Sequence, residues 1–224
     1  PAIFKTMPAN IEVKDIRYFS EGVECHGKLY LPKPLPEGKL PAVVVAPGWG
    51  ETQDAVAREA AELASAGVIA LAIDYRGWGK SGAYIYVKES VRQDDRFRFL
   101  QVTAPVELRR KRLLPRDQVD DIRNAISFLS GEAAVDPSRT SVWGFGLSAG
   151  HAFATAAVDA RVKAVLATSP LIPGAGVPAK AQRPSGPLAE EAIRLARTGR
   201  GADSQVALAD YFPFHSLSQI PETT

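Results

Sequence analysis

The stretch TSVWGFGLSAG, residues 140–150, decides the fold of this chain. Residues 140–143 predict a short buried strand, and GLSAG at 146–150 matches the pattern GxSxG immediately after it. The small residues that follow predict a helix from Ser148. Two glycines permit a tight, strained turn between strand and helix, where helical N–H groups favour an anion. We therefore expect the Ser148 hydroxyl to stand at the end of a sheet as a nucleophile.

The first half of the chain predicts further strands and one helix. Two runs joined by a turn, 11–19 and 24–31, form an expected antiparallel hairpin. Residues 42–46 and 68–73 are apolar throughout, as expected for strands covered on both faces. Residues 52–66 between them carry apolar side chains at helical spacing and end before a glycine, which favours a helix.

The second half continues the alternation of strand and helix. Residues 117–130 predict a helix, residues 136–137 a turn, and 162–167 a strand. Alternating strands and helices of this length imply right-handed crossovers. The predicted fold class is therefore α/β: a mostly parallel sheet with helices on both faces and an antiparallel N-terminal hairpin, in one domain over 1–224.

Two stretches are too long for ordinary connections of this repeat. Residues 83–116 and 171–219 are expected to form helical, cap-like insertions over the strand ends, with 188–197 as one helix. The first insertion holds the basic run Arg109-Arg110-Lys111-Arg112. We interpret this run as a solvated helix face, with attraction of an anionic substrate as the alternative.

Composition excludes several classes of function. The 224 residues include 27 basic and 25 acidic side chains, a net charge of +2 that gives no reason to expect nucleic acid as a partner. Cys25 is the only cysteine, so an intrachain disulfide and a zinc site built on several thiolates are excluded. No apolar run is long enough to span a bilayer, and the first ten residues lack the pattern of a signal peptide. We expect no membrane partner, no cofactor and no metal, and a cytoplasmic location by default, with secretion left open.

A second loop is expected beside the Ser148 turn. Residues 47–50, PGWG, follow the first predicted parallel strand and should reach the same edge of the sheet. Acyl transfer needs two N–H groups aimed at the developing oxyanion. Trp49 and Ala149 are the candidates, although the Trp49 side chain alternatively serves packing or lines an acyl pocket.

The segment DYRGWGKSG, residues 74–82, follows the next predicted strand. A catalytic interpretation of Asp74 or Arg76 is one alternative. The favoured interpretation is that these two side chains hold the turn together through a charge-assisted hydrogen bond with each other.

These segments together resemble the α/β-hydrolase superfamily, and more narrowly dienelactone-hydrolase and prolyl-oligopeptidase-like esterases and peptidases. The likeness rests on GKLYLP at 27–32, PGW at 47–49, the turn at 74–82 and the elbow at 146–150. It implies a serine hydrolase without metal or cofactor that cleaves a small carboxylic ester through an acyl-enzyme on Ser148. A peptidase or an acyltransferase would use the same parts.

The chain departs from the family pattern in two places. Pro47 stands where many members have histidine, which changes how the oxyanion loop is braced. In the family the acid and the histidine of the triad follow the nucleophile along the chain. The sixth strand is expected to end at Ala167, and 211–221 resembles the lead-in to a seventh. We therefore expect the acid and the histidine after Thr224, in a further segment or in a second chain that completes the fold.

The three histidines of the chain do not supply the missing base. His26 lies in the N-terminal hairpin, His151 should point into packing, and His215 resembles a connector residue. The rival hypothesis is therefore a non-catalytic subunit or binding module that kept the fold without a complete triad.

Overall fold

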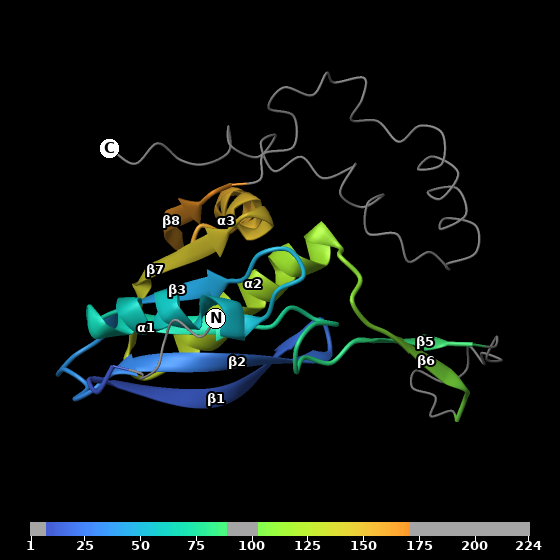
Figure 1. Cartoon of the computed structure of the whole chain (residues 1–224), viewed down its shortest axis with the longest axis horizontal. Helices are drawn as coiled ribbons and strands as arrows, with labels where there is room; N and C mark the ends of the chain where they lie inside the picture. The colour runs from blue at the N-terminus through green and yellow to red at the C-terminus, as the bar shows by residue number, and fades with distance from the viewer. Residues whose placement is uncertain (1–7, 89–102, 171–224) are drawn as a thin grey trace, which may run out of the picture.

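The structure is a computed structural model that describes residues 8–88 and 103–170. Its main feature is a twisted six-stranded sheet with the order β1-β2-β4-β3-β7-β8 (Figure 1). The first two strands, β1 (Ile11–Ser20) and β2 (Val23–Pro32), form the predicted antiparallel hairpin, and β2 also runs antiparallel to β4 (Ile69–Ile73). The predicted α/β fold class is confirmed.

The inner strands of the sheet are parallel and buried. The strand β3 (Leu40–Ala46) lies between β4 and β7 (Val135–Phe145), and β8 (Val162–Thr168) pairs with β7. Every residue of β4 is buried, as expected of a strand covered on both faces. The turn predicted at 136–137 lies inside β7, because the strand continues through a shift in its register with β3.

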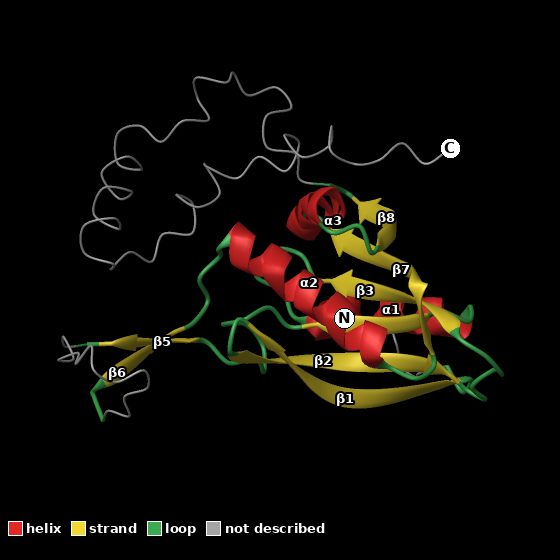
Figure 2. Cartoon of the chain, turned by 180° about the vertical axis from the view of Figure 1, so that it is seen from behind, coloured by secondary structure: helices red, strands yellow, loops and turns green. Residues whose placement is uncertain are grey.

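Helices cover both faces of this sheet (Figures 1 and 2). The helix α1 (Ala57–Ser65) packs on one face through small side chains, against Val43 and Val45 of β3. The helices α2 (Pro115–Gly131) and α3 (Leu147–Val158) cover the other face, which Val44 and other alternate residues of the same strand line. The period-two alternation of β3 thus divides one strand between two apolar cores.

The helix predicted at 52–66 begins differently from the expectation. Its first turn is a 3₁₀ helix, η1 (Gln53–Val56), and the α-helix starts only at Ala57. The N–H of Gln53 donates to the carboxylate of Asp74 at 2.8 Å, so the start of this element is tied to the turn after β4. Such 3₁₀ turns are common at the ends of α-helices.

The described part of the insertion at 83–116 contains strands rather than the expected helices. The strands β5 (Tyr84–Val87) and β6 (Val106–Arg109) form a separate two-stranded antiparallel ribbon that projects from the body of the fold (Figures 1 and 2). Residues 84–87 and 106–109 alternate side chains between two faces, which is the period of a strand. The predicted helix at 188–197 and the rest of the second insertion lie outside the described residues.

The basic run is therefore not a helix face. Arg109 ends β6, and its guanidinium carbon lies 4.5 Å from the ring centroid of Tyr86. Arg110 donates to the carbonyl oxygens of Ser81 and Gly79, so it fastens the turn after β4. Arg110 and Lys111 are exposed to solvent, whereas Arg109 and Arg112 are partly buried.

The turn after β4 is held together, but not by a bond between Asp74 and Arg76. The Asp74 carboxylate accepts from the N–H groups of Gln53 and Lys80, at 2.8 and 2.9 Å. Arg76 pairs instead with Asp121 of α2, through Nε at 2.6 Å. Asp74 and Arg76 thus hold the turn in place, as expected. The predicted bond between them was wrong, because the partner of Arg76 is Asp121, which lies more than forty residues later in the sequence.

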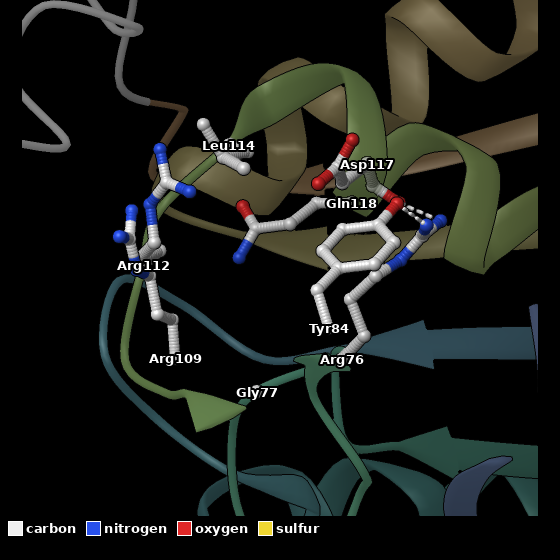
Figure 3. Close-up of a pocket in the computed structure, with 8 residues that line it drawn as sticks. All are labelled: Arg76, Gly77, Tyr84, Arg109, Arg112, Leu114, Asp117 and Gln118. Atoms are coloured by element: carbon white, nitrogen blue, oxygen red, sulfur yellow. Dashed lines mark hydrogen bonds between the residues drawn. The ribbon is translucent and has the colours of Figure 1, made fainter. Parts of the chain in front are cut away.

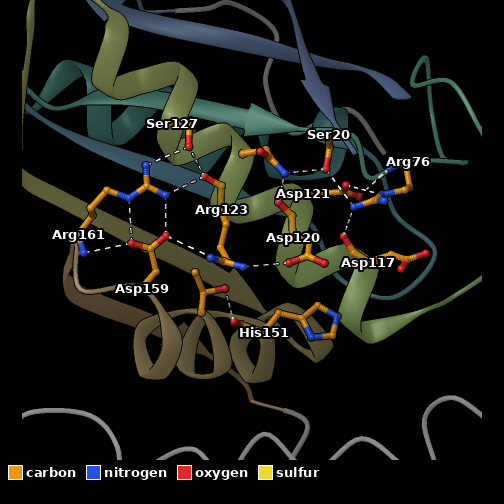
Figure 4. A network of polar contacts seen from close by, with 12 residues as sticks. Ser20, Arg76, Asp117, Asp120, Asp121, Arg123, Ser127, His151, Asp159 and Arg161 are labelled. Carbon is orange, nitrogen blue, oxygen red and sulfur yellow. Dashed lines mark hydrogen bonds and ion pairs between the residues drawn. The ribbon is translucent and has the colours of Figure 1, made fainter. Parts of the chain in front are cut away.

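Arg76 forms the centre of a buried polar network (Figure 4). Besides Asp121, it donates to the hydroxyl groups of Ser20 and Tyr84 and to the carbonyl oxygen of Asp117. Burial raises the pKa of Asp121 to about 6, and Arg76 acts against that shift. Removing one partner of such a buried pair costs about 3–5 kcal/mol, because it leaves an uncompensated charge.

Candidate active site at the carboxyl ends of the strands

Three segments meet where the parallel strands end. The loop that begins at Pro47 follows β3, Tyr75 lies in the turn after β4, and the β7–α3 connection contains Gly146. The hydroxyl of Ser148 joins all three, because its Oγ contacts the Pro47 carbonyl oxygen and the Tyr75 hydroxyl. The structure thus brings together the loop and the serine that the sequence predicts.

The Ser148 hydroxyl is buried and makes two hydrogen bonds. Only 1% of the residue is exposed, and Oγ donates its proton to the carbonyl oxygen of Pro47 in a short hydrogen bond. A hydroxyl has one proton to donate. In the 2.7 Å contact with Tyr75, the tyrosine hydroxyl is therefore the donor and Ser148 the acceptor.

The turn between strand and helix has its apex at Gly146 rather than at Ser148. The strand β7 ends at Phe145 and α3 begins at Leu147, so Gly146 is the one residue between them. Its φ of 58° and ψ of −114° lie in a region that side chains disfavour. A Cβ at this position would have no neighbour within 4 Å, so a side chain there would point into open space.

Gly144 explains why the strand and the helix pack so closely below this apex. A Cβ on Gly144 would lie 2.1 Å from the carbonyl oxygen of Ser148 and 2.6 Å from the N atom of Ala149. Both atoms belong to the first turn of α3, so the backbone of β7 passes directly beneath that turn. Ala149 is fully buried and faces the strand. The first small residue of this elbow is thus Gly144, two positions before the apex.

The second oxyanion candidate lies on the loop after β3. Its backbone is a turn in which the Gly48 N–H donates to the Glu51 carboxylate at 3.0 Å and the Glu51 N–H donates back to the Gly48 carbonyl at 3.2 Å. Gly50 provides the positive φ of 72° in this turn. The Trp49 side chain is half exposed, so it is not a core residue.

His151 packs beneath the site, as expected. It is fully buried, its Nε2 lies 2.8 Å from Gln118 Oε1, and its ring meets that of Tyr75 edge to face, with centroids 6.1 Å apart. Burial lowers the pKa of His151 to about 3, so the imidazole is neutral at ordinary pH. A neutral ring that bonds Gln118 donates from Nε2 to that oxygen.

The other histidine that the structure describes is not among the groups bonded to Ser148, although its carbonyl oxygen accepts from the Asp74 N–H in the turn after β4. His26 is on β2, where its Nε2 is 3.4 Å from the Glu24 carboxylate. His215 lies outside the described residues. The positions expected for the acid and the histidine of a triad follow Thr224 and stay a prediction.

Among the described residues, no group of His, Cys, Asp or Glu side chains is arranged to hold a metal ion. Within 8–88 and 103–170, no helix is long and apolar enough to cross a membrane.

Comparison with known proteins now identifies the family. Residues 6–174 match the family model of acetyl xylan esterase (AXE1), so the chain belongs to this family of the α/β-hydrolase superfamily. This confirms the resemblance seen in the sequence. Proteins that the chain matches include esterases and hydrolases, and the fold agrees with that class.

Two curated relatives are informative. The thiohydrolase apmlB of Arthrinium phaeospermum is 31% identical over 151 residues, which is 67% of this chain and 40% of the relative. The quorum-quenching protein AidA of Acinetobacter baumannii is 29% identical over 162 residues, 71% of this chain and 44% of the relative. The chain therefore spans less than half the length of these proteins.

Solved structures give the same fold. An acetyl xylan esterase from Paenibacillus sp. R4 is 25% identical with a TM-score of 0.61, and covers 97% of this chain and 68% of its own. The α/β hydrolase GrgF from Penicillium sp. sh18 is 21% identical with a TM-score of 0.65, over 95% of this chain and 78% of its own.

Proposed function

We propose that the protein binds small acyl ligands, carboxylic esters or thioesters, at the carboxyl edge of its sheet without forming an acyl-enzyme on Ser148. The family supports the ligand class, since matched proteins include an acetyl xylan esterase and a thiohydrolase. The geometry of the elbow supports the statement that no acyl-enzyme forms on Ser148. It agrees with the rival hypothesis of a hydrolase-like protein without a complete triad.

The observation that carries the proposal is the glycine at the elbow apex. In α/β-hydrolases the nucleophile occupies the strained residue between strand and helix, where its side chain is exposed at the top of the sheet. In this chain that residue is Gly146, which has the strained backbone and the open space but no side chain. The position from which a nucleophile acts thus holds no nucleophilic atom.

The contacts of Ser148 support a structural role for this residue. Its proton is donated to the Pro47 carbonyl, and it accepts a hydrogen bond from the Tyr75 hydroxyl. To attack a substrate, the hydroxyl would have to break both bonds and leave a site that is 1% exposed. The same two bonds hold the loop after β3 against the turn after β4.

With Gly146 at the apex, one of the two oxyanion donors also shifts by two residues, from Ala149 to Leu147. The residue after the apex is Leu147, the first residue of α3, whose N–H belongs to the unpaired end of the helix. Ala149 is buried under β7 and is a poorer donor to a ligand than the sequence suggested. We expect an acyl carbonyl to lie between the N–H groups of Leu147 and Trp49.

The second candidate function is a serine hydrolase that forms an acyl-enzyme on Ser148, with its acid and histidine after Thr224. The match of residues 146–150 to GxSxG favours it. The two candidate functions differ in which position of the elbow is open to solvent, 146 or 148. One experiment therefore separates them.

The test compares the reactivity of positions 146 and 148 in the full protein. The natural Cys25 is fully buried, and burial raises its pKa to about 12, so it gives little background with iodoacetamide. We expect Gly146→Cys to be alkylated at least about tenfold faster than Ser148→Cys, because only the first thiol is exposed. Gly38→Cys, at another glycine of positive φ with open space around it, is the matched control.

Labelling of the unaltered protein completes the test. We expect no mass increase with a fluorophosphonate, and hydrolysis of p-nitrophenyl acetate no faster than with Ser148→Ala. Calorimetry with phenyl acetate and S-phenyl thioacetate measures binding of the acyl ligand itself. A fluorophosphonate adduct on Ser148 would establish the serine hydrolase, and binding of neither acyl compound would contradict the proposed ligand class.

A further inference from the structure

A carboxylate lies directly beside the proposed acyl site, on the loop after β3. Glu51 accepts a hydrogen bond from the N–H of Gly48 at 3.0 Å, and its own N–H donates to the Gly48 carbonyl oxygen at 3.2 Å. These two bonds hold the loop in a closed turn, and Trp49 lies inside it. The Glu51 carboxylate is therefore bonded to the residue next to Trp49, whose N–H we expect to bind the acyl carbonyl.

The same carboxylate also lies next to the elbow. A Cβ on Gly48 would lie 2.7 Å from Oε2 of Glu51 and 2.9 Å from Cδ1 of Phe145, so both side chains lie against this glycine. Phe145 is the last residue of β7 and directly precedes the apex at Gly146. The charge of Glu51 is thus close to both segments that form the proposed site.

Hydrogen bonding in the loop leaves one N–H group free. The N–H groups of Gly48 and Glu51 are both used within the turn. In the part of the chain that the structure describes, the N–H of Trp49 has no hydrogen-bond partner. A free N–H donor next to a carboxylate suits a ligand that accepts a hydrogen bond and carries no negative charge.

The negative charge of Glu51 has no basic partner among the described residues. Within 8–88 and 103–170, no lysine, arginine or histidine side chain lies within salt-bridge distance of this carboxylate. Asp74, which accepts from the N–H of Gln53, likewise has none in these ranges. Two carboxylates without a paired cation thus lie at the end of the loop, and their potential is unfavourable for an anion.

The arginines of the neighbouring turn and ribbon do not offset this charge. Arg76 pairs with Asp121 at 2.6 Å. Figure 3 shows Arg76, Arg109 and Arg112 around a separate small pocket, together with Asp117. None of the residues that line this pocket belongs to the loop after β3 or to the elbow. These guanidinium groups therefore belong to the junction between the ribbon and α2 and not to the acyl site.

The start of α3 has the opposite effect on an anion, since the free N–H groups of a helix N-terminus favour negative charge. A neutral carbonyl compound suits both conditions. Its oxygen carries a partial negative charge for the N–H donors, and the molecule has no net charge for Glu51 to repel. A carboxylate anion, which hydrolysis of an ester or thioester would release, meets that repulsion in full.

We infer that Glu51 makes this site selective for neutral acyl compounds and against carboxylate anions. The inference rests on the proposed function for the identity of the acyl ligand, and it adds the charge that this ligand must have. Two unit charges about 7 Å apart in water repel enough to change a rate or an equilibrium about threefold, and a lower local permittivity increases the factor.

The test uses a thiol at the elbow apex and two alkylating reagents of similar shape, neutral iodoacetamide and anionic iodoacetate. The ratio of their rate constants at Gly146→Cys reports the local potential, because the thiolate fraction affects both reagents equally and cancels. We expect Glu51→Gln in this background to raise the iodoacetate-to-iodoacetamide ratio about threefold or more. The glutamine amide keeps an oxygen that accepts from the Gly48 N–H, so the turn is retained.

Glu62→Gln is the matched control. It makes the same change of charge at an exposed residue of α1 that pairs with Arg58, and it should leave the ratio unchanged. Thermal unfolding of each variant shows that it is folded. An equal ratio with and without Glu51→Gln, or an equal effect of Glu62→Gln, would overturn the inference.

A second measurement leaves the apex unaltered. Butyramide and sodium butyrate are similar in size and differ in charge, and calorimetry at constant ionic strength compares their affinities for the full protein. We expect tighter binding of the amide, and Glu51→Gln should narrow the difference about threefold or more. The alkylation rates need no acyl ligand to bind. Failure of phenyl acetate and S-phenyl thioacetate to bind would therefore contradict the proposed function alone, whereas an unchanged alkylation ratio would contradict the selectivity alone.

Discussion

His151 is a buried titratable side chain whose contribution to the free energy of unfolding depends on pH. In the folded protein its pKa is about 3, against an ordinary value of 6.5, because burial disfavours the imidazolium. Below pH 6.5 the unfolded chain therefore takes up a proton that the folded protein does not. The stability contributed by the neutral His151 is complete above that pH and decreases as the pH falls toward 3.

We expect this to appear as a difference between the natural protein and His151→Gln, a substitution that keeps a polar group beside Gln118. The advantage of the natural protein in unfolding free energy should shrink between pH 7 and pH 4, by up to about 1.4 kcal/mol per pH unit. Urea unfolding at several pH values measures it. Asp121, whose pKa is raised to about 6, acts in the opposite sense in this range, and the comparison cancels its effect. A constant difference across the range would contradict the prediction.

At the scale of elements, the contact between β7 and α3 depends on the absence of a side chain at Gly144. A methyl group there would meet backbone atoms of Ser148 and Ala149, which cannot rotate away as a side chain can. We expect Gly144→Ala to destabilise the protein by at least about 1–3 kcal/mol, the usual cost of overpacking.

Gly131, the last residue of α2, is the matched control for that substitution. A Cβ there has no neighbour within 4 Å, so Gly131→Ala should be neutral or should stabilise by up to about 1 kcal/mol. Equilibrium unfolding measures both variants. If Gly144→Ala were as stable as Gly131→Ala, the close approach of strand and helix described here would be incorrect.

At the same scale, the sequence predicted the strands and helices well where one period dominates. Continuous apolar runs identified β3 and β4, and a period of 3.6 identified α2 to within two residues at each end. The prediction of helices at 83–116 was wrong because it rested on the length of this insertion and not on its pattern. The alternation in 84–87 carried the correct signal, but each ribbon strand has only four residues.

The elbow shows why a motif can be aligned in two ways. Gly144, Gly146, Ser148 and Gly150 are spaced two apart, so small residues flank both 146 and 148. The pattern GxSxG selects the alignment that contains a serine, whereas the backbone selects the one centred on Gly146. Only the position at which the strand ends distinguishes the two, and strand ends are what sequence patterns fix least well.

At the scale of the whole molecule, the protection of backbone amides against hydrogen exchange should decrease from the middle of the sheet outward. The strands β3 and β4 have neighbours on both sides and cores on both faces, whereas the ribbon formed by β5 and β6 has only itself. In native-state hydrogen exchange we expect the amides of β3 and β4 to exchange most slowly and those of the ribbon among the fastest. Ribbon amides as protected as those of β4 would contradict this, and would indicate that its exposed apolar face, with Ile85 and Leu108 paired across the strands, is covered in solution.

The contacts that hold the strand ends together lie outside the apex of the elbow. The Ser148 hydroxyl, the close approach at Gly144 and the network around Arg76 connect the strand ends to each other and to α2 and α3. None of these contacts uses the apex of the elbow. These contacts that hold the scaffold are thus separate from the position at which a nucleophile would stand.

That separation has an evolutionary consequence. Some glycine codons differ from serine codons by one nucleotide, and a side chain at position 146 would enter open space. A single mutation would thus place a hydroxyl at the apex of an elbow that already has the required backbone. On the proposed function, this one substitution would supply the nucleophile that the apex lacks, and the contacts that hold the rest of the fold would stay unchanged.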